Sequence, residues 1–181
     1  MLISLGELID FIFMSFIVGY IFSDFFVQGK IRKVFDIRAI LFAAAVTAPA
    51  IILHELSHKF AAMSFGLSAT FHAAYPWLMV GVILKALSPG FIFFVPAYVL
   101  IHGTSTPLTQ TVVSVAGPLM NLVLFLIAWA VLALKIIKNS TGILFLKITK
   151  RINGFLFVFN MIPIPGFDGF QFFSGLYKLV F

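Results

Sequence analysis

An apolar run of 28 residues, from residue 39 to about residue 66, constrains the fold of this chain more than any other feature. A bilayer core about 30 Å thick needs roughly 20 residues of helix, so this run can cross a membrane with tilt. Two further apolar runs of similar length occupy residues 3–26 and 111–134. These runs predict a polytopic membrane protein built mainly from α-helices.

The composition excludes a soluble globular domain. Hydrophobic residues make up 62% of the chain, charged residues only 10%, and the mean hydropathy is +1.15, whereas a soluble surface needs far more charge. The 181 residues show no repeat or linker, so we expect one domain over residues 1–181 in a multi-pass protein of the cell membrane. The net charge is +6, and we expect the basic residues that cause it to face lipid headgroups of the bilayer. We expect no binding of nucleic acid.

Four segments are expected to enter the membrane. The first is residues 3–26, which lack the basic start and the small-residue cleavage site of a signal peptide and are read as an uncleaved span. The second and third are the runs at 39–66 and 111–134. The fourth, residues 152–162, breaks at the sequence PIPGFDG over residues 163–169. We therefore expect about four spanning helices.

The region between residues 68 and 111 has a different pattern. The sequence SATFHAAY, residues 68–75, contains strand-forming residues, and residues 90–103 are rich in them, with Pro96 best tolerated at a strand edge or a bulge. Between these two segments, residues 76–89 are apolar but too short to cross a bilayer. We expect a partly inserted β-hairpin or re-entrant region here.

The sequence HELSH places three ionisable side chains, His54, Glu55 and His58, inside the second apolar run. On a helix, residues four apart share a face, so both imidazoles point toward one position and Glu55 lies beside them. This is the zincin arrangement, which binds zinc and a water molecule. The alternative is a pair of histidines that only hydrogen-bond neighbouring helices, although ionisable groups in lipid cost about 2.5 kcal/mol or more each.

A catalytic zinc ion takes three protein ligands and keeps one position for water. The chain has no cysteine, so the third ligand must be a carboxylate or another histidine. Asp168 is the strongest candidate because it follows a backbone break at Pro163 and Pro165. Irregular backbone at membrane depth occurs only where it is buried in protein or lines a cavity. Asp168 could instead cap the following helix, and the two roles can coexist.

Three sequence elements, taken in order, resemble the site-2 protease family of intramembrane zinc metalloproteases. They are HELSH at residues 54–58, AGPLMN at residues 116–121 and NMIPIPGFDG at residues 160–169. The resemblance covers most of the chain, from about residue 39 to residue 169. The apolar insertion at residues 76–89 departs from the smaller members of that family.

The resemblance implies a role for five residues. His54, His58 and Asp168 would ligate one Zn²⁺ per chain, and Glu55 would be the general base. Asn160 would position the substrate or a reaction oxygen. An enzyme of this kind is a zinc metalloendopeptidase that hydrolyses peptide bonds within or near transmembrane segments of membrane-protein substrates.

The substrate must become extended near the cut, because a helix shields its own peptide bonds. An exposed strand edge could hold it by β-augmentation, supplied by residues 69–75 or 91–101, of which we favour the second. Water must also reach the metal. His72, His102 and Asn121 are candidate residues of a polar cleft, although hydrogen bonding between helices is the more ordinary role for each.

Two other functions fit parts of the pattern. A non-catalytic zinc-binding membrane scaffold or chaperone-like protein is expected to lack Glu55, which is present. An ion transporter is expected to show inverted repeats and several broken helices, whereas this sequence has one clear break and no repeat.

The basic residues give conflicting signals about membrane orientation. Nine of the 12 Lys and Arg residues fall in two connections expected on one side of the membrane, which the positive-inside rule places in the cytosol. The metal would then lie nearer the outer surface, whereas the family resemblance implies a site closer to the cytosol. Both orientations stay open. The nine residues are Lys30, Arg32, Lys33, Arg38, Lys135, Lys138, Lys147, Lys150 and Arg151.

Overall fold

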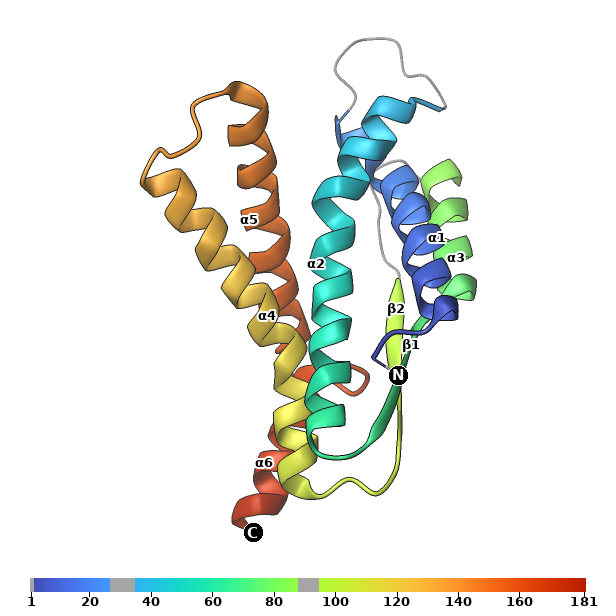
Figure 1. Ribbon diagram of the computed structural model, residues 1–181, viewed down its shortest axis with the longest axis vertical. Helices are drawn as coiled ribbons and strands as arrows, with labels where there is room; N and C mark the ends of the chain where they lie inside the picture. The colour runs from blue at the N-terminus through green and yellow to red at the C-terminus, as the bar shows by residue number, and fades with distance from the viewer. Residues whose placement is uncertain (1, 27–34, 88–94) are drawn as a thin grey trace. The chain divides into compact units, whose positions relative to one another are not determined.

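A computed structural model describes residues 2–26, 35–87 and 95–181 of the chain. The fold is mainly helical, with a small sheet of two strands in the part described (Figure 1). In chain order the elements are α1 (Leu5–Phe22), the 3-10 helix η1 (Ser23–Phe26), α2 (Ile37–Ser64), β1 (Ser68–Ala73), α3 (Tyr75–Leu87), β2 (Ala97–His102), α4 (Pro107–Ala133), α5 (Ser140–Asn160) and α6 (Asp168–Val180).

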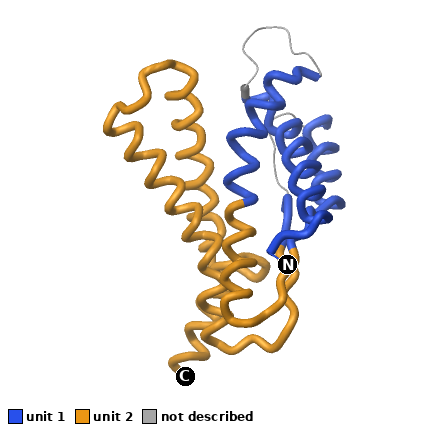
Figure 2. Tube along the Cα trace, in the orientation of Figure 1, with its two compact units in different colours: residues 1–52, 71–98 blue, residues 53–70, 99–181 orange. Residues whose placement is uncertain are grey.

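The chain divides into two compact units (Figure 2). The first consists of residues 1–52 and 71–98, and the second of residues 53–70 and 99–181. Helix α2 contributes to both, and its second half, with the HELSH sequence, belongs to the second unit. The single domain expected over residues 1–181 stays a prediction.

Among the described residues, three helices are long and apolar enough to cross a membrane. They are Leu5–Phe25, Ile37–Ser64 and Pro107–Ala133. The first three predicted spans are thus supported by length and composition. The third begins four residues earlier than expected because Thr106 accepts a hydrogen bond from the Thr109 amide and Pro107 suits a first helical turn.

The fourth predicted span is part of a longer helix. Helix α5 begins at Ser140, where the side chain of Asn139 accepts a hydrogen bond from the Gly142 amide at 2.6 Å. Three basic residues interrupt its apolar character: Lys147, Lys150 and Arg151. A fourth crossing therefore stays a prediction.

The core of the first unit is formed where α1 meets β1, α3 and the start of β2. Its buried side chains include Met14 and Val18 of α1, Phe71 of β1 and Leu78 of α3. Helix α1 approaches the first half of α2 at Gly19, where any side chain would lie 2.6 Å from the Ile40 carbonyl oxygen. Small residues permit this kind of close helix packing in lipid.

Strands β1 and β2 form an antiparallel pair, as the predicted hairpin required. The Ala74 amide donates to the Pro96 carbonyl at 3.0 Å, while further along the pair the His72 ring lies 5.7 Å from the Tyr98 ring. Strand β2 begins at Ala97, directly after Pro96, so the proline precedes the ladder. The predicted strand segment at residues 90–103 falls partly on residues 88–94, which lie outside the described residues.

The apolar insertion predicted at residues 76–89 is helical over residues 76–87. It forms helix α3, 13 residues long, between the two strands. Lys85 near its end lies 3.3 Å from the Asp24 carboxylate and 2.7 Å from the Ser23 hydroxyl, and its ammonium group also contacts the carbonyl and the ring of Tyr20. These contacts tie α3 to the end of α1, because a lysine buried among apolar groups needs compensating partners.

The outer edge of β1 is closed by two carboxylates of α1. Alternate amides of a strand point in opposite directions, so the amides of Phe71 and Ala73 face away from β2. Glu7 Oε1 accepts from the Phe71 amide at 2.8 Å, and Asp10 Oδ2 accepts from the Ala73 amide at 3.0 Å. Acidic side chains thereby replace a third strand at this edge.

In the second unit, α4 packs against both α5 and α6. Helix α6 meets the start of α4 at Gly175, where a side chain would lie 2.5 Å from the Thr111 hydroxyl. The side chains of Gln110 and Gln171 are hydrogen bonded at 2.8 Å. These contacts fix the start of α6, and with it Asp168, against α4.

Candidate metal centre

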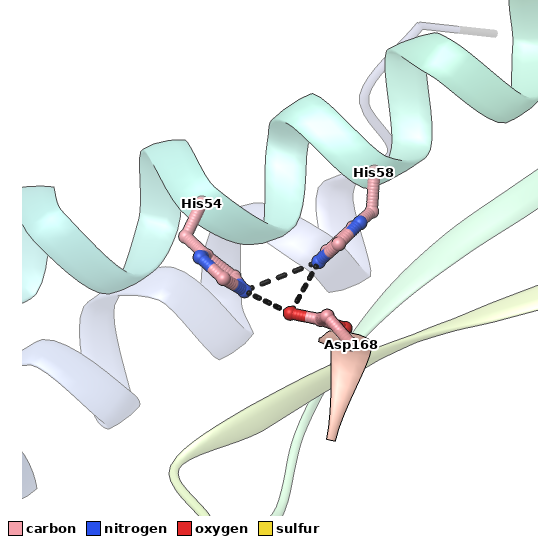
Figure 3. Close-up of side chains that lie close together, drawn as sticks. All are labelled: His54, His58 and Asp168. Carbon is pink, nitrogen blue, oxygen red and sulfur yellow. Dashed lines mark hydrogen bonds and ion pairs between the residues drawn. The ribbon is translucent and has the colours of Figure 1, made fainter. Parts of the chain in front are cut away.

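The two histidines of HELSH lie one turn apart on α2 and point the same way, as predicted (Figure 3). Both are buried, and their Nε2 atoms are 3.1 Å apart. Each Nδ1 atom has a partner on α4. The Nδ1 of His54 lies 2.6 Å from the side-chain oxygen of Asn121, and the Nδ1 of His58 lies 2.7 Å from the Val113 carbonyl. Helix α4 therefore sets the orientation of both rings.

Asp168 meets these imidazoles from the other end of the sequence. Its Oδ2 atom lies 3.1 Å from His54 Nε2 and 3.3 Å from His58 Nε2 (Figure 3). The chain turns between α5 and α6, with Gly166 at a φ of +99°, which glycine adopts without strain. Asp168 is the first residue of α6, and the preceding Phe167 occupies the capping position, so Asp168 does not act as the side-chain cap.

The three groups fit a tetrahedral zinc ion. Zn–N and Zn–O bonds of about 2.0–2.1 Å place two ligand atoms of a tetrahedral site about 3.3 Å apart. The separations of 3.1, 3.1 and 3.3 Å among the three ligand atoms lie close to this value. Each Nδ1 faces an oxygen acceptor and so carries hydrogen, which makes Nε2, the atom beside the carboxylate, the nitrogen of each neutral ring that can ligate a metal ion.

Gly117 of α4 leaves the room that such an ion needs. Any side chain there would lie 2.7 Å from His54 Nε2 and would also strike His58 Nε2. The glycine of the AGPLMN sequence therefore allows the α4 backbone to approach the metal-binding atoms themselves.

A row of buried amides continues from His54 into α5. Asn121 is fully buried, and its Nδ2 donates to the side-chain oxygen of Asn153 at 2.9 Å. Asn153 is 1% exposed, and its own Nδ2 donates to the Thr149 carbonyl at 2.8 Å. Asn121 was a candidate cleft residue in the sequence, whereas Asn153 was missed. Its signal was an amide side chain near the start of the apolar stretch that follows Arg151, a stretch that also contains Asn160.

The remaining predicted residues lie in different places. Glu55 follows His54 on α2, is half-buried, and lies close enough to His54, His58 and Asp168 to feel their charges. Asn160 is the half-buried last residue of α5. His72 belongs to the first unit, where it lies against Tyr98, and His102 is exposed at the end of β2. Neither histidine belongs to the group of described residues that could hold a metal ion.

The fold and the site define a class: a mainly helical protein with candidate membrane spans and a His-His-Asp group that could hold a metal ion, built on an H-E-x-x-H helix. A Methanocaldococcus jannaschii protein that carries the name "putative zinc metalloprotease" is 32% identical over 167 residues, which cover 92% of this chain and 82% of the relative. The chain belongs to the family of this zinc metalloprotease. No family model and no solved structure matches the chain.

Proposed function

We propose that the protein is an intramembrane zinc metalloprotease of the site-2 type. It hydrolyses peptide bonds within or near the transmembrane segments of membrane-protein substrates, with the bilayer as its surroundings and the cell membrane as its location. The observation that carries the proposal is the meeting of Asp168 with His54 and His58 on a helix apolar enough to span a membrane. The metalloprotease relative supports the protease part.

Each residue of the centre has a defined task. His54, His58 and Asp168 would hold one zinc ion and leave a coordination position for water. Zinc, when bound, activates water as a nucleophile and polarises the scissile carbonyl. Glu55 takes a proton from the attacking water as its oxygen bonds to the carbonyl carbon, and passes that proton to the amine nitrogen as the C–N bond breaks. Asn160 would orient the substrate or the reaction oxygen.

The outer edge of β2 is the proposed docking place for an extended substrate. Glu7 and Asp10 already occupy the outer amides of β1, which leaves β2 as the strand of this sheet with an unmatched edge among the described residues. Strand alternation directs the backbone groups of Ala97, Val99 and Ile101 to that edge. The structure thus supports the second of the two edges considered from the sequence.

The proposal is tested with purified protein, loaded with zinc and offered a panel of transmembrane peptides. Glu55→Gln keeps the shape and the metal ligands but cannot accept the proton, so we expect full zinc content and a loss of cleavage of at least about 100-fold, the lower end of the range for general acid–base catalysis. Mass spectrometry of the products and metal analysis provide the two readouts. Equal cleavage by both proteins would overturn the assignment. Stoichiometric zinc without cleavage of any peptide would favour the non-catalytic scaffold.

A further inference from the structure

The row of buried hydrogen bonds behind His54 has a fixed direction. It runs from the Thr149 carbonyl through Asn153 and Asn121 to the His54 ring, with donor–acceptor distances of 2.8, 2.9 and 2.6 Å. A carbonyl can only accept, so Asn153 must turn its NH2 group toward Thr149 and its oxygen toward Asn121. Buried polar groups keep such arrangements because an unmatched donor or acceptor is costly.

The same reasoning continues to the metal ligand. Asn121 must donate its NH2 group to the Asn153 oxygen, which turns its own oxygen toward His54. Only an Nδ1 atom that carries hydrogen can satisfy that oxygen. The Nε2 atom of the neutral ring then keeps its lone pair free, on the side where Asp168 lies.

The two histidines differ in the group that keeps the hydrogen on Nδ1. His58 Nδ1 faces the Val113 carbonyl, a backbone acceptor whose polarity cannot reverse. His54 faces an amide side chain, which could present either an oxygen or an NH2 group if it turned over. Asn153 removes that freedom. His54 is therefore the candidate ligand whose ring hydrogen is held in place by side chains and not by a backbone carbonyl.

We infer that Asn121 and Asn153 are positioning residues, which together hold the hydrogen of His54 on Nδ1 and aim its Nε2 at the metal. The inference rests on the zinc centre of the proposed function, and not on proteolysis itself. Groups behind a metal-bound histidine commonly change metal affinity by 10- to 100-fold. Asn153 has no contact with the metal ligands among the interactions of the described residues, so its effect must pass through Asn121.

The test is a double-mutant cycle on zinc affinity, measured by competition with a chelator. Asn121→Leu should weaken zinc binding by about 10- to 100-fold and Asn153→Leu by a smaller factor, near tenfold. The double variant should bind zinc no more weakly than Asn121→Leu alone, because Asn153 has nothing to act on once Asn121 is gone. The absorption spectrum of the cobalt-substituted protein should change in both single variants, since it reports ligand geometry.

Two further variants separate positioning from folding. Asn121→Asp keeps an acceptor for His54 and should hold zinc within a few-fold of the wild type, even if the other variants fold poorly. Asn139→Ala removes an asparagine that caps the same helix α5 away from the centre, and it should leave zinc affinity and the cobalt spectrum unchanged.

The results also distinguish the two proposals. Equal losses from Asn153→Leu with and without Asn121, or no loss in either single variant, would overturn the positioning role. A wild-type protein that binds zinc but cleaves no peptide would overturn the proposed protease while the cycle still reports on the two asparagines. A wild-type protein that binds no zinc would overturn both.

Discussion

Gly117 lies against the imidazole of His54, so closely that a methyl group on the glycine would be 2.7 Å from Nε2. This contact brings α4 near enough to α2 for Asn121 and the Val113 carbonyl to reach the two imidazoles. The absence of a side chain at Gly117 thus serves both the packing of the helices and the shape of the metal site.

We expect Gly117→Ala to lower zinc affinity by at least tenfold. The new methyl group would contact the Nε2 atoms of His54 and His58, and neither the α4 backbone nor the two rings can shift without losing a hydrogen bond. Zinc competition measures the effect. Gly142→Ala is the matched control, because its methyl group would lie 2.6 Å from the Ile137 side chain, near the start of α5 and away from His54, His58 and Asp168. Similar zinc affinity in Gly117→Ala and the wild type would contradict this reading.

Removal of zinc should destabilise the wild type and leave Asp168→Asn nearly unaffected. A ligand at 100 times its Kd adds about 2.7 kcal/mol to the free energy of unfolding, and a chelator removes that contribution. Asp168→Asn should lack most of this contribution from zinc, since a neutral amide oxygen is a weaker ligand than a carboxylate. Thermal unfolding with and without chelator gives the comparison.

Without zinc, the wild type should still have a slightly larger free energy of unfolding than Asp168→Asn. Asp168 carries a negative charge in the first turn of α6, where it interacts favourably with the helix dipole by about 0.3–1 kcal/mol. An equal response of both proteins to the chelator would show that Asp168 is not a ligand.

Much of the metal centre could be predicted from the sequence because its ligands sit on strong local signals. The spacing of His54 and His58 fixes a shared helix face, and the double proline before Asp168 marks a break in an otherwise apolar segment. The contact between Asp168 and the histidines bridges 110 residues or more of chain, and no local pattern states it. It was expected from the chemistry of a zinc site and from the family resemblance.

The groups behind the ligands were harder to foresee. A buried amide such as Asn153 has many possible partners, and only the packing of α4 against α5 selects Asn121. The same holds for the first unit, where the sequence shows Glu7 and Asp10 only as two acidic residues within an apolar run. They are paired with strand amides more than 60 residues away along the chain. Helix α3 was not specified, because residues 76–89 were recognised only as an apolar segment too short to cross a bilayer, although such a length favours a helix over a strand.

Glu7→Ala should lower the free energy of unfolding by about 1–3 kcal/mol. Glu7 is buried and accepts from the amides of Ser4 at 2.7 Å and Phe71 at 2.8 Å. Its loss would leave the buried Phe71 amide without an acceptor, which costs about that much. Denaturant unfolding in detergent is the measurement.

Ser4→Ala provides the comparison for this variant. It removes the Ser4 hydroxyl that accepts from the Glu7 amide at 3.2 Å but keeps the contact between Glu7 and the strand, so only the helix cap is lost. If Ser4→Ala were as destabilising as Glu7→Ala, the closure of the β1 edge would contribute nothing of its own.

The hydroxyl of Tyr75 should ionise at unusually high pH because of Asp10. Tyr75 donates a hydrogen bond to the Asp10 carboxylate at 2.6 Å. This bond, with a smaller contribution from burial, raises the pKa of Tyr75 from 10.0 to about 12. The difference in tyrosinate absorbance between the wild type and Tyr75→Phe should rise near pH 12, and Asp10→Asn should move that rise down toward pH 10.

The raised pKa of Tyr75 also determines how the stability of the protein changes with pH. The native protein holds the Tyr75 proton more tightly than the unfolded chain, whose tyrosine ionises near its ordinary pKa of 10.0. The stabilisation from the bond between Tyr75 and Asp10 is therefore fully present below pH 10 and is lost as the pH rises through about 12. Unfolding measured across this range should show a steeper alkaline loss of stability in the wild type than in Tyr75→Phe. Identical alkaline profiles would mean that Tyr75 and Asp10 are not paired in the folded protein.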